Sequence, residues 1–133
     1  MDTIKQYHLH KDDYAKLHFE INDSKSYLKK NQIHASVPHR HSFYQIIWFK
    51  EAGRHYVDYE TIDHEENTVF FINKNQIHYF CEDSPNNGYL FHFNDIFVND
   101  CNNGLMERFS TSIFNEIGGN HLSLDEELSL IHI

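Results

Sequence analysis

Cysteine is scarce in this sequence of 133 residues, where Cys81 and Cys101 are the only two. Two cysteines do not make the dense disulfide framework that stabilises many small secreted domains. Cys81 lies in a strand-like run and is expected to be a buried thiol, whereas Cys101 lies in a polar loop. The first six residues contain no apolar segment of a signal peptide, so a reduced, cytoplasmic protein is expected.

Long apolar runs and clusters of basic residues are missing as well. No run approaches the ~20 apolar residues of a membrane-spanning helix, so no membrane contact is expected. The sequence has 11 Lys and Arg against 20 Asp and Glu, which gives a formal net charge of −9. A nucleic-acid surface usually needs a basic excess, so these residues are not expected to bind DNA themselves.

The common signatures of nucleophilic catalysis and nucleotide binding are also absent. The sequence contains no Gly-x-Ser-x-Gly elbow and no glycine-rich phosphate loop, and neither cysteine has an evident catalytic partner. The acidic residues at 125–127 are interpreted as a negatively charged helix start rather than a catalytic carboxylate pair. The protein is therefore not expected to be an enzyme.

Aromatic residues and histidines are abundant instead. The 11 Phe and 8 Tyr residues supply most of a 15% aromatic content, which suits sheets better than helices. Protonation of all 12 His residues would turn the net charge of −9 into +3, so the charge is expected to change strongly near pH ~6. The length of 133 residues predicts one domain with a real core.

The stretch from Pro38 to Phe49 organises the predicted fold, because a His-x-His pair runs directly into an apolar, aromatic strand. Side chains alternate between the two faces of a strand. One face therefore collects His39, His41, Phe43, Gln45, Ile47 and Phe49. Polar groups at one end of such a face predict a pocket inside a β-barrel. Tyr44 and Trp48 share the opposite face and are expected in the core or in an interface.

Short strands are predicted about every ten residues, with turn-forming residues between them. The predicted segments are 15–21, 43–50, 54–59, 68–72, 76–82 and 89–93, with weaker candidates at 26–30 and 33–37. The turn at 51–53 predicts an antiparallel hairpin between segments 43–50 and 54–59. This rhythm is typical of a β-sandwich or a β-barrel.

The last third of the sequence changes character. Residues 95–98 are consistent with a helical turn, and residues 105–115 fit either a helix or a strand. Ser123 and Glu126 form a capping box that opens a helix with Leu124, Leu128 and Ile131 on one stripe. This helix stops at residue 133 without a C-cap, so we expect a longer native chain.

Two motifs resemble those of the cupin superfamily in their spacing. The first motif, His-x-His with a Glu four residues on, is occupied by His39, His41 and Gln45. The second motif is Gly, five residues, Pro-x-Gly, two residues and His. Asn67, Asn73, Asn75 and His78 occupy these four positions. Asn can replace a turn glycine because it tolerates left-handed backbone at modest cost. The resemblance implies a site for zinc, nickel, iron or manganese formed by His39, His41, Gln45 and His78, weakened because Gln45 replaces the usual carboxylate.

The stretch from about residue 34 to residue 94 resembles, more narrowly, the N-terminal sensor domain of AraC-type transcription regulators. The resembling segments are 38–49, 53–59, 68–78 and 89–93. The resemblance implies an all-β, cupin-like jelly-roll barrel (a double-stranded β-helix) over residues 1–122, with a short C-terminal helix. Residues 123–133 would begin a linker and dimerisation helix. Two helix-turn-helix units follow in such regulators, so DNA would be a partner only through a part outside this sequence.

This resemblance implies that the domain senses a small organic effector inside the barrel and forms a homodimer. The expected pocket residues are His39, His41, Gln45, His55, His78 and His92. His55 and His92 also fit the role of hydrogen-bonded structural histidines. No cofactor is expected to be required, and a divalent metal at the His cluster stays an open alternative.

A second class of function stays open, namely a small stand-alone metal-dependent cupin enzyme such as a dioxygenase or an isomerase. The three motif histidines favour it, whereas Gln45 and the unfinished helix oppose it. A binding module without any ligand is a third interpretation.

The charge balance predicts that these 133 residues do not bind DNA specifically, because phosphate contacts dominate DNA affinity and a net charge of −9 opposes them. Fluorescence anisotropy with a labelled operator-like duplex at neutral pH should show no specific complex. Submicromolar, salt-dependent binding would contradict the prediction.

Overall fold

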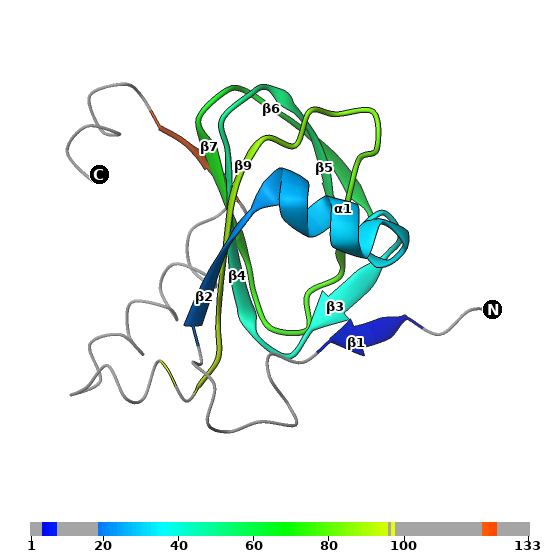
Figure 1. The fold of residues 1–133 in the computed structure, drawn as a ribbon. Helices are drawn as coiled ribbons and strands as arrows, with labels where there is room; N and C mark the ends of the chain where they lie inside the picture. Colours follow the sequence, from blue (N-terminus) through cyan, green and yellow to red (C-terminus); the bar gives the residue numbers. More distant parts are fainter. Residues whose placement is uncertain (1–3, 8–18, 96, 98–120, 125–133) are drawn as a thin grey trace.

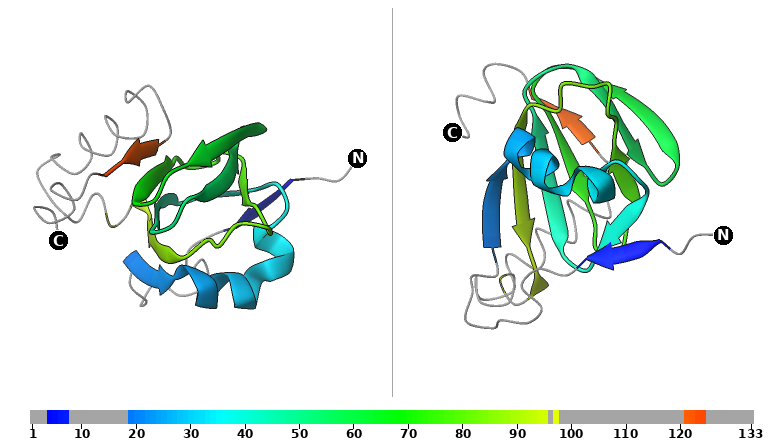
Figure 2. Two further views of the ribbon diagram at one scale, coloured as in Figure 1. Left: turned by 90° about the horizontal axis from the view of Figure 1, so that it is seen from above. Right: turned by 45° about the vertical axis from the view of Figure 1, so that its right-hand side comes forward.

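The computed structural model describes residues 4–7, 19–95, 97 and 121–124, in which two β-sheets face each other (Figure 1). The strands are β1 (Lys5–Tyr7), β2 (Phe19–Asp23), β3 (His39–His41), β4 (Tyr44–Phe49), β5 (Gly53–Val57), β6 (Glu60–His64), β7 (Thr68–Ile72), β8 (His78–Phe80), β9 (Gly88–Phe93) and β10 (His121–Ser123). The helix α1 (Ser24–Ala35) lies across one open end of the space between the sheets, as the two views in Figure 2 also show.

The strand order is that of a jelly roll. One sheet has the order β1-β3-β8-β5-β6 and the other has the order β10-β7-β4-β9-β2. Only the β1–β3 pair is parallel among the described strands. The chain changes sheet between β3 and β4, between β4 and β5, and again on both sides of β7. The predicted all-β, cupin-like class is confirmed, although no strand pair of the described part closes the two sheets into one barrel.

The core lies between the sheets and follows the predicted alternation. Along β4 the residues are alternately half-buried and buried, with Gln45, Ile47 and Phe49 facing inward. The other apolar residues of the main cluster are Ala35, Val57, Phe70, Ile72, Phe80 and Leu90, none more than 2% exposed. Each fully buried side chain of this size contributes about 1.5–3 kcal/mol of hydrophobic stabilisation. Tyr44 and Trp48 lie half-buried on the outer face, as predicted.

The helix α1 replaces the two weak strands predicted at 26–30 and 33–37, so that prediction was wrong. Asp23 is the N-cap of this helix, and its carboxylate accepts a hydrogen bond of 3.0 Å from the Ser26 backbone N–H. The helix kinks at Asn31, whose side chain donates to the Tyr27 carbonyl at 2.9 Å. Lysines stand on several sides of the helix, so the helical period is weak in the sequence.

The predicted hairpin between segments 43–50 and 54–59 was also wrong. β4 pairs with β7 and β9, whereas β5 lies in the opposite sheet and pairs with β6 and β8. The actual hairpin joins β5 to β6, a strand that the sequence reasoning missed. Its two turn residues, Asp58 and Tyr59, have φ values of 50° and 65°, as a tight turn between twisted strands requires.

The predicted elements near the termini are covered in part. β2 overlaps the end of the predicted strand at 15–21, and residues 8–18 lie outside the described residues. Asp95 and Phe97 have helical backbone, as predicted for 95–98. Residues 98–120 and 125–133 lie outside the described residues, and with them Cys101, the ambiguous segment 105–115 and nearly all of the predicted C-terminal helix. No helix of the described part is long and apolar enough to span a membrane.

Replacing Gly88 by Ala should destabilise the fold strongly. Gly88 has a φ of 156°, and a Cβ at this position would lie 1.7 Å from the carbonyl oxygen of Trp48 on the paired strand β4. The clash is with backbone, so we expect a loss of about 2–4 kcal/mol in the free energy of unfolding, measured with urea.

Gly53→Ala is the matched control for this substitution. Its Cβ would meet the movable Ser84 hydroxyl at 3.1 Å, and Gly53 is not among the residues with a left-handed backbone. Its loss of stability should therefore be much smaller. Equal losses for the two variants would contradict the role of the Gly88 contact.

Candidate functional site

Four histidines converge on the inner face of the sheet that contains β3, β8 and β5. Antiparallel pairing sets His39 opposite His78, and His41 follows on the same face of β3. The ring centroids are 4.5 Å apart for His39 and His78, 5.1 Å for His41 and His78, and 5.3 Å for His55 and His78. None of these side chains is more than 3% exposed. We call His39, His41, His55 and His78 the histidine cluster.

The turn before β8 holds this cluster in place. Asn67 and Asn75 have left-handed backbone, with φ values of 53° and 63°, so the prediction that Asn fills turn-glycine positions is confirmed. The backbone N–H of Asn75 donates to the His41 carbonyl at 2.6 Å and ties the turn to β3. Asn73 stands in the proline position, and its backbone N–H donates to the Gln76 side chain at 3.0 Å.

A hydrogen bond fixes the proton position on one ring of the cluster, and a second bond couples two further rings. His39 Nδ1 lies 2.8 Å from the Val37 carbonyl, which can only accept, so the proton is on Nδ1 and the lone pair is on Nε2. His55 Nε2 and His78 Nδ1 lie 3.1 Å apart, so one of them donates to the other. If His78 donates, its Nε2 carries a lone pair as well. Such a second hydrogen bond is how proteins orient metal-binding imidazoles.

Gln45 and His92 form a separate relay beside the cluster. The Gln45 amide N–H₂ lies 2.6 Å from His92 Nε2 and donates to it, so the ring proton is on His92 Nδ1, 3.1 Å from a Glu20 carboxylate oxygen. Glu20, His92 and Gln45 lie side by side across β2, β9 and β4. His92 also approaches His41, with ring centroids 6.2 Å apart. The sequence reasoning missed Glu20, and the alternation along β2 points the wrong way, because the apolar Ile21 is 56% exposed while Glu20 contacts the buried His92.

Two further histidines, the buried His64 and the half-buried His121, were not predicted to belong to the site. His64 stacks on Phe49 with ring centroids 4.3 Å apart and donates from Nδ1 to the Glu65 carbonyl at 3.1 Å. His121 of β10 stacks on Phe70 at 5.0 Å. Both pack against the aromatic core rather than against the histidine cluster, and no spacing motif marks either of them.

Burial keeps the imidazoles of the cluster uncharged. Desolvation, reinforced by neighbouring histidines, lowers the pKa of His41 and His78 well below the usual value of 6.5. The same cause lowers the pKa of His55 to about 3. Desolvation also lowers the pKa of His39, against the hydrogen bond to Val37, which raises it. At neutral pH the cluster is therefore a set of neutral rings that both donate and accept hydrogen bonds.

Three of the cluster residues meet the requirements of a metal site. One ring nitrogen from each of His39, His41 and His78 lies within 4.8 Å of the other two. Neutral imidazoles are ligands that zinc, nickel, iron and manganese accept. Gln45 contributes no charge, and its amide nitrogen is engaged with His92. The residues present therefore fit a divalent ion but offer it no carboxylate.

Several buried polar atoms of the site have no hydrogen-bond partner among the described residues, namely Gln45 Oε1, His55 Nδ1 and His78 Nε2. A buried polar atom left in this way costs about 1–3 kcal/mol. Such atoms commonly mark a place where water, an ion or a ligand binds. All three residues are among those predicted from the sequence to line a pocket.

The comparison with protein families agrees with this geometry. The sequence model of the AraC-like ligand binding domain matches residues 27–110. The chain belongs to this family. The matched range contains every predicted pocket residue of this AraC-like domain, from His39 to His92, and strands β3 to β9. No curated protein matches the chain. The resemblance to AraC-type sensor domains is confirmed, and the roles of the individual pocket residues stay predictions.

The lowered pKa values predict that this AraC-like domain loses stability in mild acid. The unfolded chain binds protons on the four histidines of the cluster near pH ~6.5, whereas the folded chain keeps these four rings neutral at that pH, so stability is full above it and falls below it. His55 alone, with a pKa of about 3, should lower the free energy of unfolding by about 2 kcal/mol at pH ~5. Urea unfolding between pH ~7.5 and ~5, in the presence of a chelator, measures this loss.

His55→Gln should reduce the loss, whereas His34→Gln, on the exposed surface of α1, should leave it unchanged. A free energy of unfolding that is the same at both ends of this pH range would show that the cluster is not neutral in the folded state.

Proposed function

We propose that this domain is the effector-sensing and dimerisation module of an AraC-type transcription regulator. The family match supports a ligand-binding, regulatory role rather than a catalytic one. The observation that carries the proposal further is the set of buried polar atoms without a partner among the described residues, on Gln45, His55 and His78. An apolar core would gain nothing by keeping them, whereas a polar ligand between the sheets would satisfy them.

The effector in this proposal is a small polar organic molecule. Its contacts would be the predicted pocket residues His39, His41, Gln45, His55, His78 and His92. Neutral imidazoles and an amide recognise hydroxyl and carbonyl groups by exchanging hydrogen bonds and offer no ion pair. Such a site rejects a molecule that cannot fill the hydrogen bonds, because its own polar atoms would stay buried and unpaired.

A chain of aromatic contacts leads from the cluster to β10. His55 packs against Phe70 with ring centroids 5.3 Å apart, and Phe70 stacks on His121 of β10 at 5.0 Å. β10 pairs with β7 at one edge of its sheet. We propose that the effector shifts the position of β10 and of the linker helix predicted after it, and so the placement of a DNA-binding part.

A divalent metal is not required in this proposal. His39, His41 and His78 would hold such an ion, and it would supply Lewis-acid chemistry when bound. The lack of a carboxylate should keep the affinity moderate. The alternative function, a small metal-dependent cupin enzyme, is favoured by this same trio of imidazoles.

The proposed function predicts that polar effectors stabilise the domain through the cluster. In a thermal-shift screen with neutral sugars and phenols in the presence of a chelator, a binding compound should raise the Tm of the wild type. His78→Ala should stay folded and lose that shift, because it removes an inward-facing imidazole. His34→Ala, in the exposed part of α1, should keep the shift.

Metal content separates the two functions. The proposal predicts little change in Tm on chelation and far less than one ion per chain after purification without an affinity tag. One tightly held ion per chain, with a large drop in Tm on chelation, would support the enzyme instead.

A further inference from the structure

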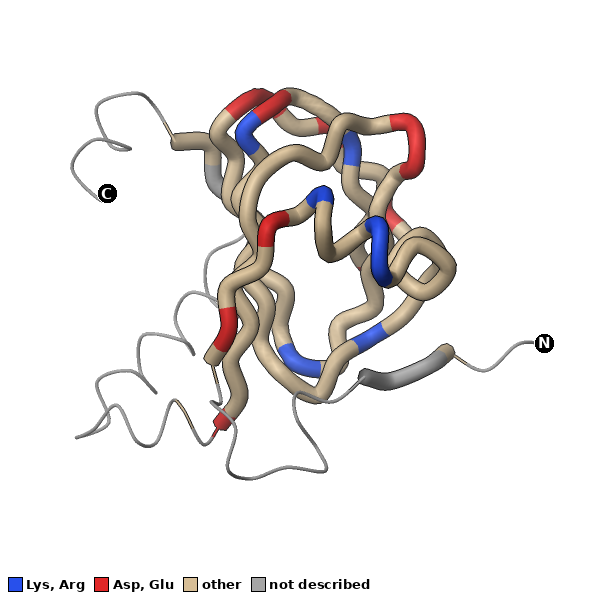
Figure 3. The backbone as a smooth tube through the Cα atoms, viewed as in Figure 1, with Lys and Arg blue, Asp and Glu red and all other residues tan. Residues whose placement is uncertain are grey.

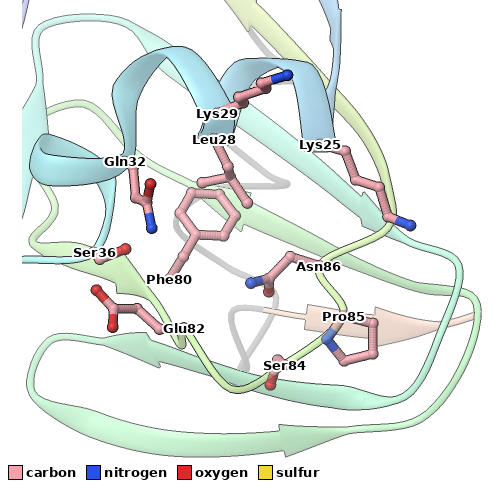
Figure 4. Close-up of a pocket in the computed structure, with 10 residues that line it drawn as sticks. All are labelled: Lys25, Leu28, Lys29, Gln32, Ser36, Phe80, Glu82, Ser84, Pro85 and Asn86. Carbon is pink, nitrogen blue, oxygen red and sulfur yellow. The ribbon is translucent and has the colours of Figure 1, made fainter.

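A cavity lies outside the histidine cluster, between α1 and the loop that joins β8 to β9 (Figure 4). Its volume is about 320 Å³, at the lower end of the range for small-molecule sites. Phe80 and Leu28 form an apolar floor. Phe80 is 2% exposed and packs against His55 with ring centroids 4.8 Å apart. None of the predicted pocket residues lines this cavity.

The rim of the cavity is basic, in contrast to the rest of the chain. α1 contains three lysines and no acidic residue, in a sequence with a net charge of −9 (blue segments on α1 in Figure 3). Lys25 and Lys29 line the cavity, and Lys25 extends toward the loop of Pro85 and Asn86 (Figure 4). Glu82 is the only acidic residue among the described residues that line it. The Lys29 ammonium points away from the cavity in Figure 4, so the Lys25 ammonium is the cation that can attract an anion there.

Asn86 presents a hydrogen-bond acceptor to the same cavity. Its side chain extends from the loop toward Phe80 (Figure 4) and is 7% exposed. The amide nitrogen donates to the Cys81 carbonyl at 2.8 Å, which fixes the orientation of the amide. Asn86 Oδ1 is then buried without a partner among the described residues. A ligand that fills this position must supply an O–H or N–H donor.

We propose that this cavity binds a small organic acid that carries a hydroxyl group on an apolar body. The carboxylate lies at Lys25, the apolar body lies on Phe80 and Leu28, and the hydroxyl donates to Asn86 Oδ1. The site is separate from the histidine cluster and goes beyond the proposed effector site. Phe80 contacts both the cavity and His55, so a molecule bound under α1 also touches the wall of the cluster.

The three isomeric hydroxybenzoates are suitable probes, because they hold a carboxylate and a hydroxyl at three separations on one flat apolar ring. Benzoate lacks the hydroxyl, and 3-hydroxybenzyl alcohol lacks the charge. In two-dimensional ¹H–¹⁵N spectra of the 133-residue chain, at least one isomer should shift the resonances of α1 and of residues 80–86. That isomer should bind more tightly than both benzoate and the alcohol.

Lysine variants test the charge. Lys25→Gln should weaken binding of the acid about threefold, the size expected for one exposed ion pair. Lys30→Gln removes a lysine of the same helix that does not line the cavity, and it should leave the affinity unchanged. His78→Ala should also leave it unchanged, which separates this site from the histidine cluster.

Four results would each overturn the proposal. The first is that no isomer shifts these resonances, the second is that the neutral alcohol binds as tightly as the acids, and the third is that Lys30→Gln weakens binding as much as Lys25→Gln. The fourth is loss of binding in His78→Ala, which would show that the acid binds at the histidine cluster and not under α1.

Discussion

The structure depends on keeping a group of histidines uncharged inside an aromatic core. His41, His55 and His78 lie between the sheets with at most 2% of their surface exposed. A charged imidazole there would lose its hydration without gaining a carboxylate partner, which costs far more than burial of the neutral ring. The domain therefore holds the imidazoles of the histidine cluster only as neutral donors and acceptors. That condition suits recognition of an uncharged polar molecule and also suits a metal ion.

Strand register provides the hydrogen bonds that this condition requires. The pairing of β3 with β8 sets His39 opposite His78, and the pairing of β5 with β8 brings His55 within 3.1 Å of His78. In the other sheet, Glu20, His92 and Gln45 are neighbours across three strands. Glu20 is the acidic member of the relay and lies at the partly exposed end, with 33% of its side chain accessible. Charge is thus confined to the rim, while the interior stays neutral.

Local patterns in the sequence were enough to predict which residues of β4 face inward and that the motif residues come together. The period of two along 43–49 is a property of one strand, and the Asn67-to-His78 spacing describes β7 with the turns before and after it. The partners of β4 were not predictable in this way, because β7 and β9 compete with the adjacent β5. Glu20 reaches His92 across 72 residues of sequence, and only the register of β2 against β9 brings them together. α1 was missed because its capping by Asp23 resembles a turn.

The protonation state of the buried imidazoles is the central claim, and long-range ¹H–¹⁵N NMR spectra of the histidine rings measure it directly. At pH ~7 the rings of His41, His55 and His78 should show the separate nitrogen shifts of neutral imidazole, and His39 should carry its proton on Nδ1. These signals should persist on acidification until the domain unfolds. Imidazolium signals from these rings in the folded domain, or a proton on His39 Nε2 with Nδ1 bare, would contradict the account.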